Sequence, residues 1–392
     1  MKIFNHSPGL WSLASSQNAL FAFLCSRLLI LLILVVATQV KLEPIQGWEG
    51  TIFQPTLDLS LSSVRHSLAL KLLGADASWY VGIAEGGYSR APAEINQPQN
   101  WVFFPLLPLM LRGLTYLTGS YLISGVIISN LALLGALIVL EQLAPLLGFS
   151  SRSAKFAVWL VAFWPMSYFF SAPLTESSFL LLLELSYLAL LRGKPITAGV
   201  FFGLLTACRP TGMLMLPGFA LSVWRLKQTN SLRGLGALLL APLGLVAFLL
   251  YLWSLTGNPL IFADNQQYWG RGSSLQQMVL AVVSEPQRLM VAWNFILLNS
   301  LAALLVLWAS WKLIRLRLYD LAFLVALPIA IALSTGTVQS LTRFTMVMFP
   351  VFLIMAANIK TELGERIALG VSASLLAGMT VMYGLSLTAA MA

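Results

Sequence analysis

Charge and cysteine are what this sequence has least of. Only 9% of its 392 residues are charged, whereas a soluble domain carries roughly 25%, and 58% are hydrophobic. Cys25 and Cys208 both lie in apolar segments. They indicate neither a metal site nor a disulfide framework, and we interpret them as packing residues. The shortage of charge, together with continuous apolar runs of about 20 residues, predicts an all-α integral membrane protein.

Several catalytic motifs are missing as well. The sequence has no HExxH spacing, no Walker loop and no GxSxG elbow, so an ATP-driven pump and a serine hydrolase lack support. It also has no DxD motif, which argues against a nucleotide-sugar enzyme that chelates a cation in that way. We therefore assign no metal ligands and no resident cofactor, and the need for a divalent cation stays open. The net charge of +9 does not indicate a nucleic-acid partner, because the basic residues stand in short loops between apolar runs.

The apolar runs predict a single membrane domain over residues 1–392 with about 10–12 membrane helices or half-helices. Residues 19–40 form the first run, and since no clear cleavage site follows it, we expect an uncleaved helix rather than a signal peptide. The other runs lie at about 102–118, 122–147, 154–173, 176–192, 196–224, 234–255, 290–311, 318–335, 343–359 and 367–390.

Loop charges predict the topology, because short loops rich in Lys and Arg mark the cytoplasmic side. If the N-terminus is cytoplasmic, basic loops on the cytoplasmic side alternate along the chain with the remaining loops on the other side. This alternation requires that 102–118 is interfacial and that 196–224 is a hairpin of two short helices. The first extracytoplasmic loop is then 41–101. The basic loops are Arg152/Lys155, Arg192/Lys194, Arg225/Lys227/Arg233, Lys312/Arg315/Arg317 and Lys360/Arg366.

Asp76 is the first candidate for chemistry in the loop 41–101. It fits a general base at the membrane–water boundary or, equally, the N-cap of a short helix. The aromatic residues Trp79 and Tyr80 fit a platform for sugar stacking or an interfacial aromatic belt, of which the belt is commoner. Glu85 follows in the same loop. Arg65 and His66 precede Asp76 and could help to bind phosphate, although a lone loop histidine is more often incidental.

Three further charged residues fall on the same side in this topology. Glu176 begins an apolar run, where a place in the first turn of a helix is the simpler explanation. Arg209 interrupts an apolar stretch, which is costly and marks a functional candidate. Arg343 begins another run, where snorkelling would explain it, yet two arginines here would suit a phosphate-bearing lipid. Gln266 and Trp269 are candidates for substrate contact in the loop 256–289.

An ordered set of segments between about residues 65 and 352 resembles the PIG-V family (glycosyltransferase family 76), the mannosyltransferases of GPI-anchor assembly and their bacterial relatives. The matching segments are GADASWY with IAEGGY (74–88), FFPLLPL followed by Arg112, SAPLTES (171–177), RPTG (209–212), GNP (257–259) with QQYW (266–269), and Arg343-Phe344 up to Phe349-Pro350. The sequence departs from the family pattern at Ala75, where the family usually has Trp, and at Leu174, where it usually has Tyr.

The resemblance implies a GT-C fold, a multi-helix membrane bundle with a structured first extracytoplasmic loop that supplies a catalytic aspartate, here Asp76. It also implies a polyprenyl- or dolichyl-phosphate sugar, most simply mannose, as donor, and inversion at the anomeric carbon. Arg209 and Arg343, with Arg65 and His66 behind them, would then bind the donor phosphate. The remaining candidates named above would contact substrate.

Other functions stay open at this stage. A transporter or lipid flippase would also have many helices and an intramembrane charge, although no internal repeat is evident. A non-catalytic subunit of a glycan-assembly complex is a further alternative. The acceptor is not specified: a GPI intermediate, a glycolipid, a cell-wall polymer and a secreted protein all fit. We expect a multi-pass protein of a bacterial plasma membrane, or of the endoplasmic reticulum in a eukaryote, with an extracytoplasmic active site.

Overall fold

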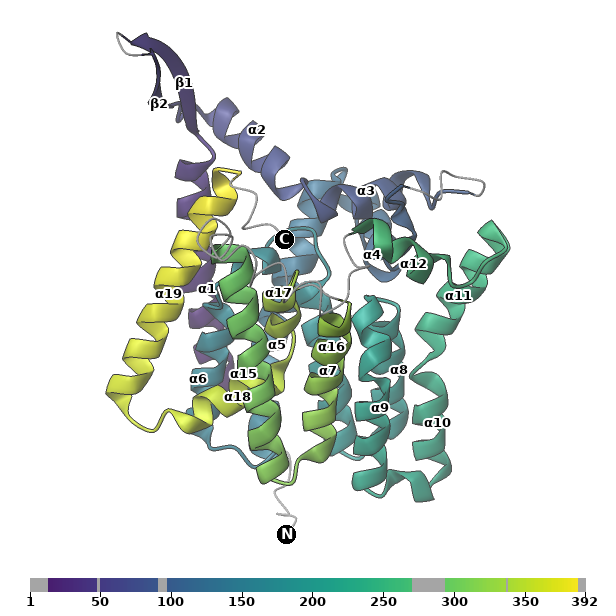
Figure 1. Cartoon of the computed structure of the whole chain (residues 1–392). Coiled ribbons are helices and arrows are strands. Elements are labelled where there is room, and N and C mark those ends of the chain that lie inside the picture. The colour runs from purple at the N-terminus through teal and green to yellow at the C-terminus, as the bar shows by residue number, and fades with distance from the viewer. Residues whose placement is uncertain (1–12, 48–49, 91–96, 270–292, 336–337, 387–392) are drawn as a thin grey trace.

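The chain folds into a bundle of membrane helices that is covered at one end by a cap of shorter elements (Figure 1). The computed structural model describes residues 13–47, 50–90, 97–269, 293–335 and 338–386. Within these ranges five helical spans are long and apolar enough to cross a membrane, which confirms the predicted multi-pass helical fold. They are Ser16–Ala37, Tyr121–Leu146, Leu232–Thr256, Ile296–Arg315 and Glu362–Gly384.

The bundle contains both long and short helices. In chain order they are α1 (Leu13–Ala37), α5 (Tyr121–Leu146), α6 (Ser151–Ala162), the 3-10 turn η2 (Ser167–Phe170), α7 (Glu176–Leu191), α8 (Pro195–Thr206), α9 (Pro210–Arg225), the 3-10 turn η3 (Gln228–Asn230), α10 (Leu232–Leu240), α11 (Leu243–Thr256), α15 (Trp293–Arg315), α16 (Tyr319–Ser334), α17 (Leu341–Met346), α18 (Phe349–Asn358) and α19 (Glu362–Gly384). The buried apolar side chains of these helices form one large core.

The cap is built from segments that lie between the membrane helices in sequence. It contains a hairpin of β1 (Val40–Gly47) and β2 (Gly50–Leu57), followed by α2 (Leu61–Leu72), α3 (Asp76–Gly86), η1 (Asn100–Val102), α4 (Leu106–Thr118), α12 (Ile261–Asp264) and η4 (Asn265–Trp269). The two strands pair antiparallel, from Val40↔Leu57 to Gly47↔Gly50. The prediction of an all-helical chain did not include this hairpin. Each strand contains a proline, which argues against a central strand but is tolerated in a two-stranded ribbon, where both strands are edges.

Three of the predicted apolar runs are interrupted in the structure. Helix α6 ends at Ala162, and the rest of the run 154–173 is irregular apart from η2; the run 234–255 divides at Ala241–Pro242 into α10 and α11. The run 343–359 divides into α17 and α18. Proline has no N–H to donate and clashes with the preceding turn, so it breaks a helix without lowering the hydropathy of the sequence.

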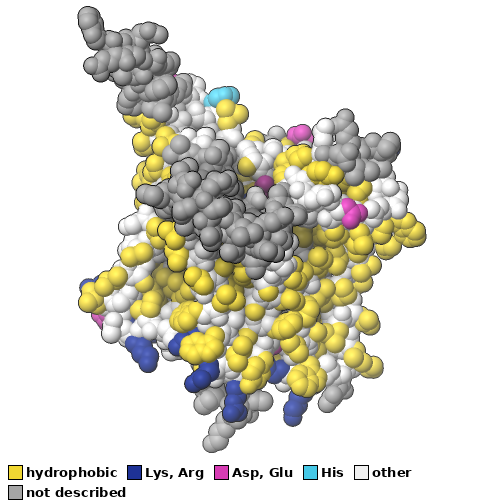
Figure 2. Space-filling view, in the orientation of Figure 1, with side chains coloured by type: hydrophobic (Ala, Val, Ile, Leu, Met, Phe, Trp, Pro, Cys, Tyr) yellow, Lys and Arg dark blue, Asp and Glu magenta, His cyan; other side chains and the backbone are white. Residues whose placement is uncertain are grey.

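The charged side chains are distributed unevenly along the axis of the bundle. Lys and Arg side chains gather at the end opposite the cap, as Figure 2 shows. One of them, Arg152 at the start of α6, forms an ion pair with Glu365 of α19 at 2.7 Å. The middle of the bundle surface is almost entirely apolar in the same view, which is the surface expected of a protein surrounded by lipid.

Close packing between α5 and the segment before α7 gives a testable contact. At Gly125 an added Cβ would lie 2.6 Å from Cγ of Pro173 and 3.1 Å from its Cα. We expect Gly125→Ala to destabilise the protein by about 1–3 kcal/mol, the usual cost of overpacking, seen as a lower Tm in detergent. Gly378→Ala in α19 is the control, since nothing lies within 4 Å of the added methyl. A Gly125→Ala variant as stable as that control would contradict the contact.

Candidate active site

Four charged residues that are far apart in sequence meet where helices begin or break. Asp76 is the first residue of α3 and Glu176 is the first residue of α7. Arg209 immediately precedes α9 with an extended backbone (φ −153°, ψ 152°), because a residue before proline is pushed out of the helical region. Arg343 lies in the short helix α17. The interruptions of the helices therefore bring polar side chains into an otherwise apolar bundle.

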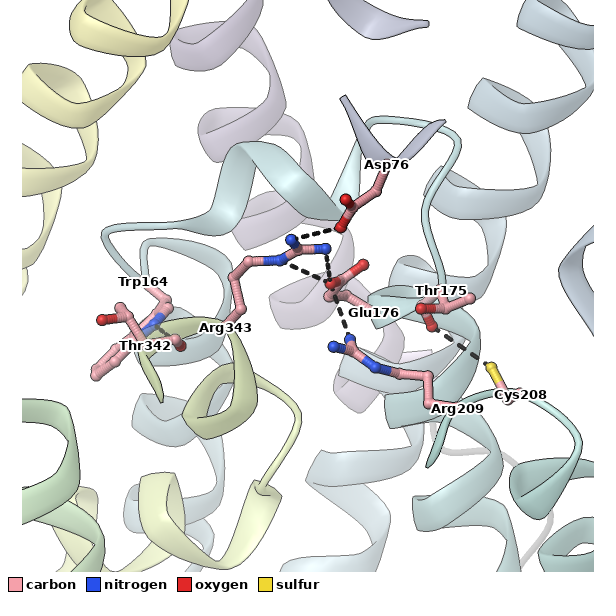
Figure 3. Close-up of polar contacts among 8 residues, drawn as sticks. All are labelled: Asp76, Trp164, Thr175, Glu176, Cys208, Arg209, Thr342 and Arg343. Atoms are coloured by element: carbon pink, nitrogen blue, oxygen red, sulfur yellow. Dashed lines mark hydrogen bonds and ion pairs between the residues drawn. The ribbon is translucent and has the colours of Figure 1, made fainter. Parts of the chain in front are cut away.

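These residues form a chain of ion pairs (Figure 3). Arg343 donates from Nη1 to Oδ2 of Asp76 at 2.7 Å, and from Nε and Nη2 to Oε1 of Glu176 at 3.1 and 2.7 Å. Arg209 Nη1 lies 2.8 Å from the same Oε1. Glu176 is thus shared by two arginines, while Asp76 is bound by one. The side chains of Glu176 and Arg343 are 0% and 9% exposed, whereas Asp76 is 33% exposed, so Asp76 is the member of the cluster that solvent or substrate can reach.

Two buried polar groups in the cluster have no hydrogen-bond partner among the described residues. The contact of Arg209 Nη1 with Glu176 is close but is not aligned as a hydrogen bond, and Oε2 of Glu176 has no donor. The guanidinium of Arg209 lies 6.0 and 5.7 Å from the rings of Phe179 and Phe344. Buried polar atoms are nearly always paired. Nη1 of Arg209 can therefore donate to a further anionic or polar group.

The guanidinium of Arg343 also packs on an aromatic ring. Its central carbon lies 4.4 Å from the centre of the Phe169 ring in η2. Asp76, Arg343 and Tyr383 line a small cavity of about 10 Å³ between the cap and η2, room for about one water molecule. The space left between these side chains is therefore too small for anything larger than water.

The aromatic candidates form a group beside the ion pairs. Trp79 stacks on Phe103 at 5.7 Å, and Trp269 makes edge contacts with both rings at 5.3 and 5.2 Å. Tyr80 is buried and makes an edge contact with the ring of Phe103 at 5.1 Å. Burial raises the pKa of the Tyr80 hydroxyl well above its usual range, so this group stays protonated and can donate a hydrogen bond.

The other predicted site residues lie elsewhere. Arg65 and His66 are exposed on α2, and Glu85 is exposed near the end of α3, where its backbone carbonyl accepts a hydrogen bond from Arg112. Gln266 is half-buried in η4. None of these four has a contact with the ion-paired cluster in the part of the chain that the structure describes. The four members of that cluster are therefore the main candidates for the functional site.

Two basic residues near the cluster were not among the predicted site residues. Lys71 at the end of α2 is buried, donates to Ser386 Oγ at 2.9 Å and lies 4.6 Å above the ring of Tyr383. Burial lowers the pKa of its ammonium group. Arg27 in α1 reaches the segment around η2. Arg27 had a visible signal, because it is a charge inside an apolar run; Lys71 had none that separates it from neighbouring loop residues.

An apolar groove lies directly beside the cluster. It has a volume of about 340 Å³ and is lined by α6, the residues just after it, α15, α18 and α19. The lining residues include Leu160, Trp164, Ala302, Met355 and Ala368. Thr342 also lines it, and the next residue in the chain is Arg343. Adjacent residues on a helix point in different directions. Helix α17 therefore has Thr342 at the groove and Arg343 at the carboxylates of Asp76 and Glu176.

The described residues include no group of three or more His, Cys, Asp or Glu that could hold a metal ion. The chain has no match among curated proteins or among solved structures. A family model described as mannosyltransferase (PIG-V) matches residues 17–269. This range contains Asp76, Glu176 and Arg209 and ends before Arg343. Because the match covers more than half of the 392 residues, the chain belongs to the PIG-V family of mannosyltransferases and is a multi-pass membrane glycosyltransferase.

Proposed function

We propose that the protein transfers mannose from a polyprenyl-phosphate donor to an acceptor hydroxyl, with inversion, at the cluster of Asp76, Glu176, Arg209 and Arg343. The observation that carries this proposal is the position of the cluster. A partly exposed carboxylate and two buried arginines lie next to an apolar groove between membrane helices. An anionic lipid needs both parts, a set of cations for its phosphate and an apolar channel for its chain. Family membership favours this enzyme over a transporter or flippase.

Asp76 is the proposed general base. Only its Oδ2 is bound by Arg343 among the described residues, so Oδ1 can accept the proton of the acceptor hydroxyl. The acceptor oxygen then bonds to the anomeric carbon as the bond from that carbon to the phosphate oxygen breaks. One base and one leaving group on opposite faces give inversion, and no covalent enzyme intermediate is needed.

The arginines are the proposed binding groups for the phosphate. The donor is a phosphodiester with one negative charge, and its leaving group is a phosphomonoester that gains a second. Arginine presents a planar fork of donors that suits phosphate, and Nη1 of Arg209 makes no hydrogen bond among the described residues although it lies 2.8 Å from Oε1 of Glu176. A phosphate that draws Arg343 toward itself also releases Asp76 from its ion pair, so donor binding frees the base for proton transfer.

The groove is the proposed site of the isoprenoid chain. Its lining is almost entirely aliphatic and aromatic, and its volume of about 340 Å³ lies in the range of small-molecule sites, roughly 300–1,000 Å³. Thr342, the residue before the arginine that would hold the phosphate, is among its lining residues. A chain leaving the phosphate would therefore enter the groove and continue into the surrounding lipid.

The orientation supports an extracytoplasmic site. Basic side chains gather at the end of the bundle away from the cap (Figure 2), and short basic segments favour the cytoplasm. The cap, with α3 and Asp76, would then face the opposite side, a bacterial periplasm or the lumen of the endoplasmic reticulum. The acceptor would approach Asp76 from that side, past the aromatic group of Trp79, Phe103 and Trp269.

The donor is tested with purified protein, a mixed membrane-lipid acceptor pool, and either polyprenyl-phosphate-mannose or GDP-mannose, both radiolabelled. Label is expected to transfer from the lipid donor alone. We further expect Ala368→Phe to fill the groove and raise KM for a long-chain donor at least about 10-fold, while KM for a short-chain analogue changes little, because several buried CH₂ contacts of ~0.8 kcal/mol each are lost. Ile367→Phe is the control, since Ile367 is exposed and outside the groove.

Either of two results would contradict this proposal. Transfer from GDP-mannose at a rate similar to that from the lipid donor would exclude a dedicated lipid-donor enzyme. Equal effects of Ala368→Phe on long-chain and short-chain donors would place the isoprenoid chain somewhere other than the groove.

A further inference from the structure

Arg27 is a charged residue near the middle of the first membrane span, Ser16–Ala37. Arginine is a strong base and carries a full positive charge at neutral pH. A charged side chain at this depth is costly and is a functional candidate by default. No carboxylate forms an ion pair with Arg27 in the part of the chain that the structure describes, so charge neutralisation does not explain it.

The guanidinium of Arg27 instead binds neutral oxygen atoms. Nε donates to Oγ of Ser26 in α1 itself at 3.3 Å, and the other acceptors lie in one segment after α6. Nη1 donates to the backbone carbonyl of Ser167 at 2.8 Å and to Oγ of Ser171 at 2.9 Å. Nη2 donates to the carbonyl of Ala162 at 3.0 Å and to Oγ of Ser167. A single side chain on α1 thereby joins the last residue of α6 to both ends of η2.

This segment needs such donors because it is irregular and lies among membrane helices. The last carbonyls of a helix have no partner within the helix, and polar backbone groups at membrane depth must be paired inside the protein. Arg27 pairs the carbonyl of Ser167 in the turn. It also binds the carbonyl of Ala162, the last residue of α6, which accepts a second hydrogen bond from Oγ of Ser167 at 2.7 Å. A side chain with fewer or less divergent donors could not bind all of these acceptors.

The segment carries two supports of the ion-paired cluster. Phe169 lies under the guanidinium of Arg343 at 4.4 Å. The segment then leads into α7, whose first residue Glu176 binds Arg343 and Arg209. It is tied to α7 by Ser177, which donates to the carbonyl of Phe170 at 2.9 Å. A shift of the turn would therefore move both the ring below Arg343 and the carboxylate beside it.

We propose that Arg27 is a positioning residue for the transfer reaction. From α1 it fixes residues 162–171. Phe169 and Glu176 then hold Arg343 in the position needed to bind the donor phosphate. This role rests on the proposed function for its catalytic consequence, but its structural part stands on the hydrogen bonds alone. Arg27 contacts neither carboxylate of the cluster, and it acts through the segment that supports them.

The catalytic consequence is tested with Arg27→Gln and Arg27→Lys. We expect both to lower kcat by about 10–100-fold, because a misplacement of about 1 Å can cost about 10²-fold in rate, while donor KM changes by less than about 3-fold. Lysine keeps the charge but not the fork, so it should not restore turnover. Arg27→Gln combined with Phe169→Leu should lose less than the product of the two single losses, because both act through one turn.

Arg225→Gln is the matched control. Arg225 is a partly buried arginine that pairs with Asp320 at 2.9 Å between α9 and α16, so its loss also destabilises the bundle, but it has no contact with the η2 turn. We expect that variant to lower Tm while the folded protein keeps its kcat. Hydrogen exchange of peptides covering 163–174 should be faster in Arg27→Gln and unchanged in Arg225→Gln.

The outcomes separate the positioning role from the proposed donor. Near wild-type kcat in Arg27→Lys would show that the fork of donors is not needed and would overturn the inference. Unchanged exchange at 163–174 in Arg27→Gln would overturn it as well, and faster exchange with unchanged kcat would reduce Arg27 to a purely structural role. A wild-type protein that transfers no mannose would contradict the proposed donor, while the exchange measurement still decides whether Arg27 fixes the turn.

Discussion

Asp76→Asn is expected to lower kcat for mannosyl transfer by about 10²–10⁴-fold, the usual contribution of a general base. Asparagine has nearly the same shape and still accepts a hydrogen bond from Arg343, but it cannot take the proton of the acceptor hydroxyl. Donor KM should change far less, because the two arginines and the groove remain. The measurement is steady-state transfer from polyprenyl-phosphate-mannose by the wild type and the variant, purified side by side.

Glu85→Gln is the control for this substitution. Glu85 lies on the same helix, α3, but its side chain is exposed and makes no contact with the cluster among the described residues. We expect Glu85→Gln to keep wild-type turnover. Arg343 retains two hydrogen bonds to Glu176 in Asp76→Asn, so Tm should fall only slightly and loss of fold cannot mimic loss of the base. Near-normal turnover of Asp76→Asn would reduce Asp76 to an ion-pair partner.

Three members of the charged cluster, Glu176, Arg209 and Arg343, could be singled out from sequence by one rule. In a chain with 9% charged residues, a carboxylate or arginine inside or beside an apolar run is costly and therefore visible. Asp76 lies in the loop 41–101 instead, and it was singled out with the aromatic residues beside it and by the family resemblance.

The same rule for charges in apolar runs would have identified Arg27, which interrupts the first run. It could not distinguish Arg65 and His66, which are exposed on α2, from Lys71 on the same helix, which is buried near Tyr383. That difference depends on which face of α2 packs against the bundle.

The pairing within the cluster could not be predicted from the sequence. Arg343 binds Asp76 across 267 positions of the chain and Glu176 across 167, and a single sequence contains no signal for such contacts. The N-cap alternative for Asp76 was equally open. In the structure Asp76 lies inside the first turn of α3 and no side chain caps this helix, so the carboxylate is directed to Arg343.

Besides the pairing within the cluster, the backbone conformation of Ala75, just before Asp76, could not be predicted from the sequence. Ala75 has φ 51°, a left-handed conformation that disfavours a residue with a Cβ. Such strain costs about 1–3 kcal/mol and persists where the surrounding structure imposes it, often at functional sites. At this position it turns the chain sharply between α2 and α3, and it brings Asp76 over the guanidinium of Arg343 rather than along the surface of the cap.

Removal of Arg343 should lower catalytic efficiency by a similar factor. The cause differs, because Arg343 is proposed to stabilise the leaving phosphate, whereas Asp76 is proposed to activate the acceptor. We expect Arg343→Ala to lower kcat/KM by about 10²–10³-fold, the range found for loss of one group that stabilises developing negative charge, or about 2.7–4 kcal/mol. The phosphate gains a negative charge as the glycosidic bond breaks, and Arg209 alone would then have to balance it. Arg343→Lys should recover part of the loss, since it keeps the charge but cannot bridge Asp76, Glu176 and phosphate with one planar fork.

The control for Arg343 is Arg112→Lys on the exposed side of α4, where Arg112 contacts only a backbone carbonyl among the described residues. It should leave kcat/KM unchanged. Glu176 keeps its contact with Arg209 at 2.8 Å when Arg343 is removed, so the buried carboxylate still has a cation and the bundle should remain folded, as Tm can verify. Arg343→Ala with kcat/KM within about 3-fold of wild type, a difference worth less than ~1 kcal/mol, would mean that Arg343 only holds the helix starts together. The phosphate would then be bound by Arg209, and Lys71, which lies 4.6 Å from the centre of the Tyr383 ring, would be the next cation to test.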